Sequence, residues 1–384
     1  MKDTTQRGIN FNNGKLTINK KNIKKNLLAL LVGLIIGFVL IEVSFRVVYA
    51  VNGKDPIFWD ADKRCIYRWI QHMESKSSKS LFQDTNMYEY DSILGWKTQG
   101  NLTNKSMPTT FFGQIKGTYL VSTNSRGIRG KKEYNYSRKP GFNRIVIVGD
   151  SYTFGSQVND EFVYPYILEQ LLAKTEVINM GVGAYGTDHM YLSFIGEGIK
   201  YNPDTLLFGI WTGDIMRTVN RCANYFKPKF EIKDNDLVLT NVPVPPPEQV
   251  LKMKYKTYFH SYFIDSMLSK LFIKNPNPKK AEEGREITEK LLVKLQTLSK
   301  EKGFDLIVLI LPREVPIEHE ENINDGIVEF MAKERIGFLD LRQTMYNFRT
   351  KNPNIPLWFS HFTPIGNEFV ARSIVDVLVN EGEG

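Results

Sequence analysis

Cysteine, histidine and tryptophan are scarce in this chain of 384 residues, which has two cysteines, five histidines and five tryptophans. It contains no CxxC pair, so there is no local motif for a structural zinc site or a redox dithiol. Cys65 and Cys222 either form a disulfide or are two unrelated small core residues, and both interpretations stay open. A phosphate-binding glycine loop and a nucleic-acid motif are also missing, so we expect no cofactor, no metal and no nucleic-acid partner.

The composition is nevertheless that of a folded protein. It has 42% hydrophobic and 24% charged residues, over a length that suits one large domain or two ordinary ones. The formal net charge of +8 would by itself point to an acidic partner. Much of the excess lies in the first 25 residues, ahead of a hydrophobic stretch, in the lysines Lys15, Lys20, Lys21, Lys24 and Lys25. The charge is therefore first a signal of membrane topology.

The hydrophobic stretch covers residues 26–51 and is uncharged from Leu27 to Ile41. Roughly 20 residues are enough for a helix to cross a hydrocarbon core of about 30 Å, so we predict a single membrane anchor. The positive-inside rule places residues 1–25 in the cytoplasm as a basic tail. It places the chain after Val51, and with it the main domain, in the periplasm or outside the cell.

Two other interpretations compete with the anchor. Val48-Tyr49-Ala50 loosely resembles a signal-peptide cleavage site, although the apolar segment is longer than the core of a usual signal peptide. A buried helix of a soluble domain is the other alternative, and the basic flank disfavours it. Glu42 and Arg46 are four residues apart and can pair on one face where the helix leaves the membrane.

The rest of the chain divides by pattern. Residues 52–140 are rich in Tyr, Asn, Ser and Gly, which predicts a β-rich extension of short strands and loops. Residues 141–384 alternate apolar strands with amphipathic helices. Strands apolar on both faces indicate a parallel sheet covered on both sides, so the expected fold class is a three-layer α/β/α, flavodoxin-like domain. Residues 220–280, with the segment NVPVPPPEQV, interrupt it as a lid or a surface excursion.

The first strand of this domain, RIVIVG, ends at Gly149-Asp150-Ser151, at the sheet edge where ligands bind in such folds. Ser151 is either a helix cap or a nucleophile, and its position alone favours the cap. A nucleophilic serine needs a base, and His361 can reach the same edge because it precedes the final helix. The other histidines lie in polar stretches, in the interruption, or on a helix where a structural role is expected: His72, His319, His260 and His189.

Four blocks in order resemble the SGNH/GDSL hydrolase family over most of residues 144–380: GDSYTFG, VINMGVGAYGTDHMYL, YNPDTLLFGIWTGDI and FSHFTPIGNEFVARSI. The upstream TNSRGIRG is similar to the lead-in of membrane-anchored and secreted bacterial members. The resemblance implies that Ser151 is the nucleophile and His361 its base. It further implies that the oxyanion is held by backbone N–H groups of Ser151 and Ala184 and by the third-block position, Gly213.

Three positions depart from the family's pattern. Gly213 stands where the family has an asparagine that binds the oxyanion, and Ala184 where it has a glycine that donates a backbone N–H. Trp358 stands where the family has the aspartate that orients the base. Loss of one oxyanion donor typically costs about 10²–10³ in rate, and loss of the acid on the order of 10⁴.

A replacement acid would restore the orientation of His361. Our first candidate is Asp340, at the end of FLDL; the other candidates are Asp214, Asp150, and Ser360 or a backbone carbonyl acting in a dyad. Asp214 and Arg217 lie just beyond the third strand and are candidates for binding a polar substrate; otherwise they are a helix-start acid and a surface arginine. Lys227 is expected on a solvated face.

These observations predict a membrane-anchored serine esterase or O-acyltransferase that works through an acyl-enzyme. Its placement and the family resemblance imply an O-acylated, in particular acetylated, envelope polysaccharide as substrate. The partners expected are this glycan or another ester, membrane lipid around the N-terminal helix, and a transmembrane acyltransferase that supplies acyl groups. The alternative from another class is a catalytically impaired domain of the same fold that binds glycan or serves as a membrane-assembly subunit.

Overall fold

The computed structural model describes residues 9–12, 15–18, 20–51, 87–111, 114–223, 225–246, 249, 261–272, 278–314 and 326–380. The chain divides into two units, and each is described by itself. One unit comprises Met1–Asp60 and Tyr258–Asn275, and the other comprises Ala61–Thr257 and Pro276–Gly384.

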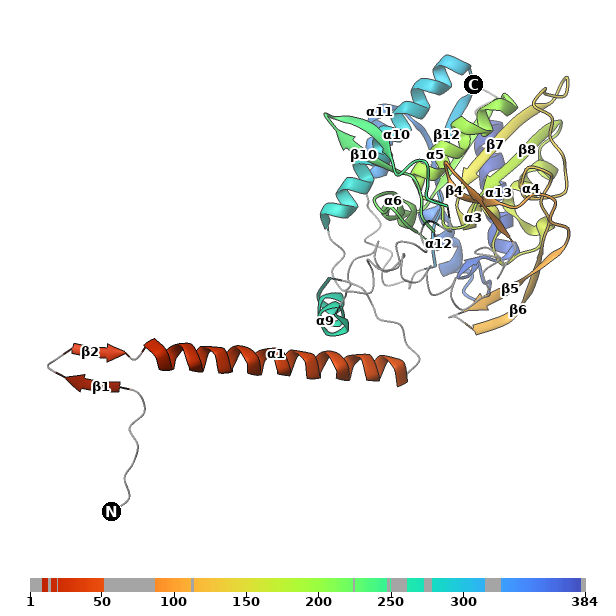
Figure 1. Cartoon of the computed structure of the whole chain (residues 1–384). Helices are drawn as coiled ribbons and strands as arrows, with labels where there is room; N and C mark the ends of the chain where they lie inside the picture. Colours follow the sequence, from red (N-terminus) through yellow and green to blue (C-terminus); the bar gives the residue numbers. More distant parts are fainter. Residues whose placement is uncertain are drawn as a thin grey trace. The chain divides into compact units, whose positions relative to one another are not determined.

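The smaller unit is built around one long helix, α1 (Lys20–Val51), which follows the paired strands β1 (Ile9–Asn12) and β2 (Lys15–Ile18) (Figure 1). Its apolar segment has a mean hydropathy of 2.7 and none of it is buried. By length and composition α1 can cross a membrane, a test that a signal sequence also passes. A second helix, α9 (Tyr262–Phe272), comes from the predicted interruption and packs against α1.

The larger unit is organised by a five-stranded parallel sheet in the order β13-β12-β9-β7-β8. Its strands are β7 (Asn143–Gly149), β8 (Thr175–Gly181), β9 (Thr205–Ile210), β12 (Asp305–Ile310) and β13 (Gly337–Asp340). Numbered by their order in the chain, this is the 2-1-3-4-5 arrangement of flavodoxin-like folds. The order reverses between β7 and β9, so the carboxyl end of β7 is the topological switch point where such sheets bind ligands.

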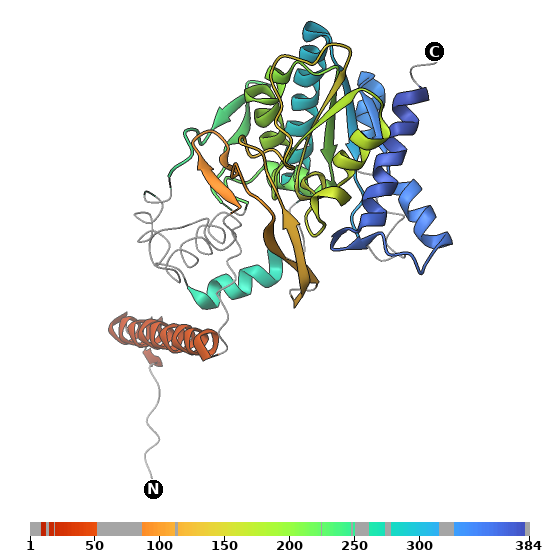
Figure 2. The same cartoon turned by 90° about the vertical axis from the view of Figure 1, so that its right-hand side faces the viewer.

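Helices cover both faces of the sheet because alternate strand residues point to opposite sides. Val146 and Val148 share a core with α5 (Thr187–Gly196), α10 (Pro278–Lys302) and α11 (Ile327–Glu334). Ile145 and Ile147 share the other core with α4 (Tyr164–Leu171), α12 (Arg342–Lys351) and α13 (Pro364–Asn380). Figure 2 shows the cyan α10 and the dark-blue α13 on opposite sides of the sheet. The predicted three-layer α/β/α fold is confirmed.

Short elements lie around the carboxyl edge of the sheet: α3 (Ser151–Phe154), η1 (Asp160–Phe162), α6 (Thr212–Thr218), β14 (Trp358–Phe359) and β15 (His361–Phe362). A further short helix, η2 (Gly198–Tyr201), lies between α5 and β9 in the chain. The segment before the sheet forms two antiparallel hairpins, β3 (Tyr88–Asp91) with β4 (Gly95–Thr98) and β5 (Lys105–Phe111) with β6 (Gln114–Val121). Trp96 of β4 is fully buried in the core below α5. Residues 52–86 of the predicted extension lie outside the described residues.

The predicted interruption at 220–280 contributes the hairpin of β10 (Lys229–Lys233) and β11 (Asp236–Thr240) as well as α9. Of the segment NVPVPPPEQV the structure describes residues 241–246 and 249, and residues 250–260 lie outside the described residues, so a lid there stays a prediction. Cys222 is disulfide-bonded. The sequence has one other cysteine, Cys65, which lies outside the described residues.

Candidate active site

Ser151 is the first residue of α3, immediately beyond the carboxyl end of β7. The cap of this helix is Asp150, whose Oδ1 accepts the backbone N–H of Tyr152 at 2.8 Å. The capping role that position alone favoured for Ser151 therefore belongs to its neighbour, because an aspartate at the N-cap meets the free N–H groups of the first turn. The hydroxyl of Ser151 is left to face the sheet edge.

His361 reaches this hydroxyl from the other end of the domain, with 2.9 Å between His361 Nε2 and Ser151 Oγ. The ring lies against Tyr152, with 5.0 Å between ring centroids. The Tyr152 hydroxyl donates to the carbonyl of Ser360 at 3.2 Å, which ties the turn before His361 to α3. Ser360 itself has a left-handed φ of 65°, so the β14–β15 turn is tight.

Burial lowers the pKa of His361 below its ordinary value. The negative charge of Asp150 opposes this shift and the positive charge of Arg217 reinforces it. The imidazole is therefore neutral at neutral pH, with Nε2 able to accept a proton from Ser151. This protonation state is the one that a general base requires.

The other ring nitrogen of His361 has no carboxylate bonded to it among the described residues. Its neighbour there is Ser360 Oγ, 3.4 Å from Nδ1. Gln157 Nε2 donates to this hydroxyl at 2.8 Å, and the Ser360 N–H donates to Glu314 at 3.1 Å. Trp358, at the position of the family's acid, is buried, and its indole N–H points to the Pro312 carbonyl at 3.4 Å.

The structure does not bring Asp340 to His361. Arg342 binds both oxygens of the Asp340 carboxylate, through Nε at 2.9 Å and Nη2 at 2.7 Å. This pair forms because β13 ends at Asp340 and α12 begins at Arg342, so the two side chains are neighbours in the chain. The arrangement around Nδ1 instead matches the alternative in which Ser360 orients the ring.

Asp150, Asp214 and Arg217 form one ionic cluster beside the serine. Arg217 Nη1 lies 3.0 Å from Asp150 Oδ2 and 2.6 Å from Asp214 Oδ1. The same Asp150 oxygen lies 3.3 Å from Ser151 Oγ. Asp214 is fully buried, and burial together with the Asp150 carboxylate raises its pKa well above the ordinary value. The Arg217 side chain keeps 26% of its surface exposed, so it is the member of the cluster that can meet a substrate.

Backbone N–H groups of Ser151 and Ala184 have no hydrogen-bond acceptor within the described part of the chain. Ala184 has a φ of 66°, the left-handed conformation that favours glycine, so the loop geometry expected of a glycine persists with alanine. Trp96 holds this loop by donating from Nε1 to the Gly183 carbonyl at 3.1 Å. The Tyr185 hydroxyl donates back to the Trp96 carbonyl at 2.7 Å.

The N-terminal hairpin thus fixes the second-block loop, which sequence reasoning did not foresee. The available signal was Trp96, a large aromatic residue in a polar segment with little apolar material for a core of its own. His189 takes part as the structural residue that was expected: its ring stacks on Tyr185 at 4.4 Å, and its Nε2 lies 2.9 Å from the Leu94 carbonyl.

Lys227 is not on a solvated face. It is fully buried and ion-paired with the buried carboxylate of Asp188. Its ammonium also donates to the carbonyls of Pro228 and Asn220 at 2.9 and 3.2 Å. The prediction failed because residues 225–228 fold back over the second-block helix, a long-range contact that a local charge pattern does not record.

At Gly213 the structure leaves no room for a side chain while the Trp211 ring keeps its position. A Cβ on Gly213 would lie 2.1 Å from Cη2 and 2.2 Å from Cζ2 of Trp211. The Trp211 indole N–H donates to Asp150 Oδ2 at 2.9 Å. The Trp211 ring, anchored to the buried carboxylate of Asp150, therefore lies where a side chain at position 213 would begin.

No family model matches the chain, and no curated protein matches it. It is similar to the solved structure of a member of the lipolytic protein G-D-S-L family from Veillonella parvula (14% identity, 62% of this chain and 98% of that one, TM-score 0.36). It is also similar to those of a GDSL-like lipase from Bacteroides thetaiotaomicron (14%, 63% and 89%, 0.34) and a catalytic mutant of an acetylxylan esterase from Geobacillus stearothermophilus (13%, 62% and 95%, 0.37).

The first two of these carry the name of the family that the four sequence blocks resemble. At these identities the likeness concerns the fold. The fold class itself stands on the sheet order and on the helices that cover both faces.

Proposed function

We propose that this protein is a membrane-anchored serine esterase or O-acyltransferase that works through an acyl-enzyme. The observation that carries the proposal is the 2.9 Å contact between Ser151 Oγ and His361 Nε2 at the switch point of the sheet. Serine and histidine within hydrogen-bond reach, with a neutral imidazole, form an activated nucleophile.

The reaction begins when Ser151 Oγ attacks the ester carbonyl carbon and His361 Nε2 takes the hydroxyl proton. The carbonyl oxygen becomes an oxyanion that the N–H groups of Ser151 and Ala184 stabilise. Collapse of this intermediate releases the alcohol, which takes the proton from His361, and leaves the acyl group on Ser151. Water then gives hydrolysis and a sugar hydroxyl gives transfer, with His361 accepting the proton of whichever attacks.

Among the described residues, charge on the imidazolium is stabilised without a carboxylate on Nδ1. Asp150 faces the same serine, and its negative charge raises the proton affinity of His361. Ser360 Oγ at 3.4 Å sets the orientation of the ring. We therefore propose a Ser151–His361 dyad, assisted electrostatically by Asp150, in place of the triad.

The anchored location is supported by two observations. Residues of α1 make hydrogen bonds with residues 261–263, which favours an α1 that stays in the mature chain over a cleaved signal sequence. Cys222 is disulfide-bonded, and disulfides persist in oxidising compartments outside the cytoplasm. With the basic tail inside, the domain would face the periplasm or the exterior, where O-acetylated envelope polysaccharide is the substrate that we propose.

The experiment that tests the proposal uses the full-length chain in detergent and a fluorophosphonate that reacts only with activated serines. Intact mass would show one adduct on the wild type and on Ser373→Ala, a control on α13 away from the site. Ser151→Ala and His361→Ala would show none. Absence of the adduct on folded wild-type protein would contradict the esterase and favour a glycan-binding or assembly subunit.

Hydrolysis and transfer are separated by the fate of the acyl group. The adduct-forming enzyme would be given an O-acetylated polysaccharide alone and then with a deacetylated acceptor glycan. Free acetate in both reactions identifies a hydrolase, whereas new O-acetyl groups on the acceptor identify a transferase. A transferase that acts only when a transmembrane acyltransferase is present in the same membrane would fit the partner that we expect.

A further inference from the structure

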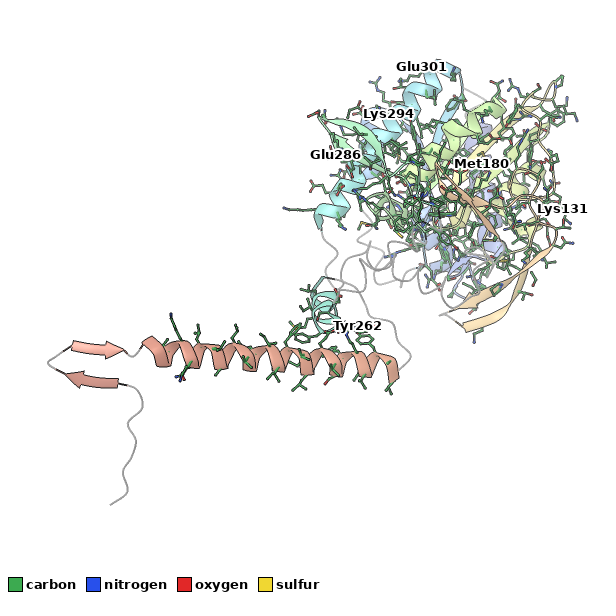
Figure 3. The ribbon with its side chains drawn as sticks, in the orientation of Figure 1. Lys131, Met180, Tyr262, Glu286, Lys294 and Glu301 are labelled. Carbon is green, nitrogen blue, oxygen red and sulfur yellow. The ribbon has the colours of Figure 1, made fainter. Side chains whose placement is uncertain are left out.

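Helix α9 meets α1 through a specific set of aromatic contacts. The ring of Phe263 packs edge-on against Phe45, with 5.4 Å between centroids, and Tyr262 packs against Tyr49 at 5.6 Å. The guanidinium of Arg46 lies 4.5 Å above the Tyr262 ring. Figure 3 shows Tyr262 on the side of α9 that faces α1. Both helices belong to the smaller unit, although more than 200 residues separate them in the chain.

A single carboxylate of α1, that of Glu42, caps the first turn of α9. It accepts the Ser261 hydroxyl at 2.7 Å and the N–H groups of Tyr262 and Phe263 at 3.0 and 3.1 Å. These N–H groups have no partner inside their own helix, and a negative charge is favoured beside them. Arg46 Nε, one turn along α1, donates to the same carboxylate at 2.7 Å.

The position of Glu42 along α1 indicates the depth at which α9 lies relative to a membrane. The uncharged run from Leu27 to Ile41 rises about 22 Å, which is less than the roughly 30 Å of a hydrocarbon core. If α1 spans the membrane with Leu27 at the inner boundary, Glu42 lies within the outer part of the apolar layer, where an ionised side chain must be paired. Arg46 and the first turn of α9 supply the pairing, so α9 must lie at the same depth as Glu42.

Two hydrophobic side chains of α9 are exposed. Ile264 is 43% exposed and Met267 is 50% exposed, whereas Asp265 and Ser266 between them are buried. On α1 the neighbouring residues Val43 and Val47 are exposed to a similar extent. Exposed aliphatic side chains on a helix fastened to a membrane span are those expected of a helix at the lipid interface.

We propose that α9 is an interfacial membrane helix, seated beside α1 by Glu42 and covered by lipid at Ile264 and Met267. The inference rests on the membrane anchor of the proposed function and goes beyond it. It adds a second attachment: the chain meets the bilayer through α9 as well as through α1. The partner of this surface is the acyl-chain region of the bilayer.

The test uses the full-length protein in phosphatidylcholine nanodiscs that contain nitroxide-labelled lipid. An environment-sensitive fluorescent amino acid replaces Met267 or, separately, Ile264. Leu34 in α1 is the lipid-facing control, and Val238, exposed on β11, is the solvent-facing control. We expect blue-shifted emission and strong quenching at 264 and 267, comparable with position 34, and neither effect at 238. Emission at 264 and 267 that matches position 238 would overturn the proposal.

The role of Glu42 is tested with the probe at position 267. Glu42→Ala removes the cap, so quenching at 267 should fall toward the solvent control while quenching at position 34 persists. Glu42→Gln keeps one acceptor oxygen and should retain part of the quenching. Glu89→Ala, which removes an exposed carboxylate paired with Lys97 in the larger unit, is the matched control and should change nothing. Unchanged quenching in Glu42→Ala would refute Glu42 as the fastening group.

Two further readings separate this inference from the proposed function. Flotation of the protein with vesicles reports the anchor, and hydrolysis of a soluble ester reports the active site. Flotation and hydrolysis without quenching at 264 and 267 would overturn the interfacial helix alone. Quenching without hydrolysis would support the helix while the esterase fails, and loss of flotation would overturn the anchor and with it the helix.

Discussion

The indole ring of Trp211 occupies the space into which a side chain at Gly213 would project, with Cη2 at 2.1 Å from the Cβ position. The Trp211 ring in this position requires glycine at 213. An asparagine at 213 would in turn require a smaller residue at 211. The two positions therefore form a pair. One member of the pair, Trp211, also donates to the buried Asp150.

Gly213→Asn alone should lower both stability and ester hydrolysis, because the new Cβ cannot coexist with the ring. The double variant Trp211→Gly/Gly213→Asn should accept the amide and restore an oxyanion donor, which in other enzymes is worth about 10²–10³ in rate. The measurement is kcat/KM for a soluble ester alongside thermal unfolding of the full-length chain. A double variant no faster than Gly213→Asn would show that the amide cannot reach the oxyanion in this loop.

The pH profile should reflect the lowered pKa of His361. The base acts in its neutral form, so kcat/KM should be constant at neutral pH and fall only as the pH drops through an apparent pKa below the ordinary histidine value near 6.5. The measurement is kcat/KM for a neutral ester over acidic and neutral pH. A midpoint above the ordinary histidine value would contradict the assignment.

The companion variant for the pH profile is Asp150→Asn. It keeps an oxygen that can cap Tyr152 but removes the charge that raises the pKa of His361. The midpoint should move further down, and kcat/KM should fall because the imidazolium loses a stabilising charge. An unchanged midpoint would show that Asp150 has no electrostatic influence on the base.

Asp340→Asn and Ser360→Ala distinguish the two ways of orienting His361. Asp340 is bound by Arg342, so its replacement should leave kcat for a soluble ester within a few-fold of the wild type. Ser360→Ala removes the group beside Nδ1 and should reduce kcat more than KM. A fall in Asp340→Asn on the order of 10⁴ would instead identify Asp340 as the triad acid.

Lys227→Met should destabilise the protein strongly because it leaves the carboxylate of Asp188 buried without its main partner. Breaking a buried pair in this way costs about 3–5 kcal/mol, and the double variant Asp188→Asn/Lys227→Met should recover part of the loss. Lys294→Met, which removes an exposed pair with Asp236, should cost less than about 1 kcal/mol. Urea unfolding monitored by tryptophan fluorescence measures all three, and equal losses in both single variants would contradict the buried pair.

Much of this architecture was predictable because it depends on short-range patterns. Five apolar strands alternating with helices indicate a covered parallel sheet, and that sheet is present in the flavodoxin-like order. The meeting of Ser151 and His361 was predicted for the same reason, since both follow strand-like segments. Which of the candidate groups lies beside His361 Nδ1 was not predictable, because turn geometry and rotamers at the sheet edge decide which side chain orients the ring.

Lys227 and Trp96 mark the limit of local reasoning. A lysine in KPKF has the composition of a surface residue, and only the fold-back onto Asp188 makes it a buried ion. Trp96 lies in a polar segment, yet it holds the loop that carries the Ala184 N–H. Neither the Lys227–Asp188 pair nor the Trp96–Gly183 hydrogen bond produces a periodic pattern in the sequence.

By itself the sequence determined the apolar anchor segment, the layered fold, and the placement of Ser151 and His361 at one sheet edge, because each follows from hydrophobic periodicity and strand ends. Only the tertiary structure decided that Asp150 caps α3, that Trp211 displaces the oxyanion amide, and that Glu42 caps α9. The Trp211 contact depends on packing, and the Glu42 cap depends on hydrogen bonds between a side chain and the backbone of another helix. Such choices are settled by shape and by the need to satisfy buried polar groups, which no local pattern encodes.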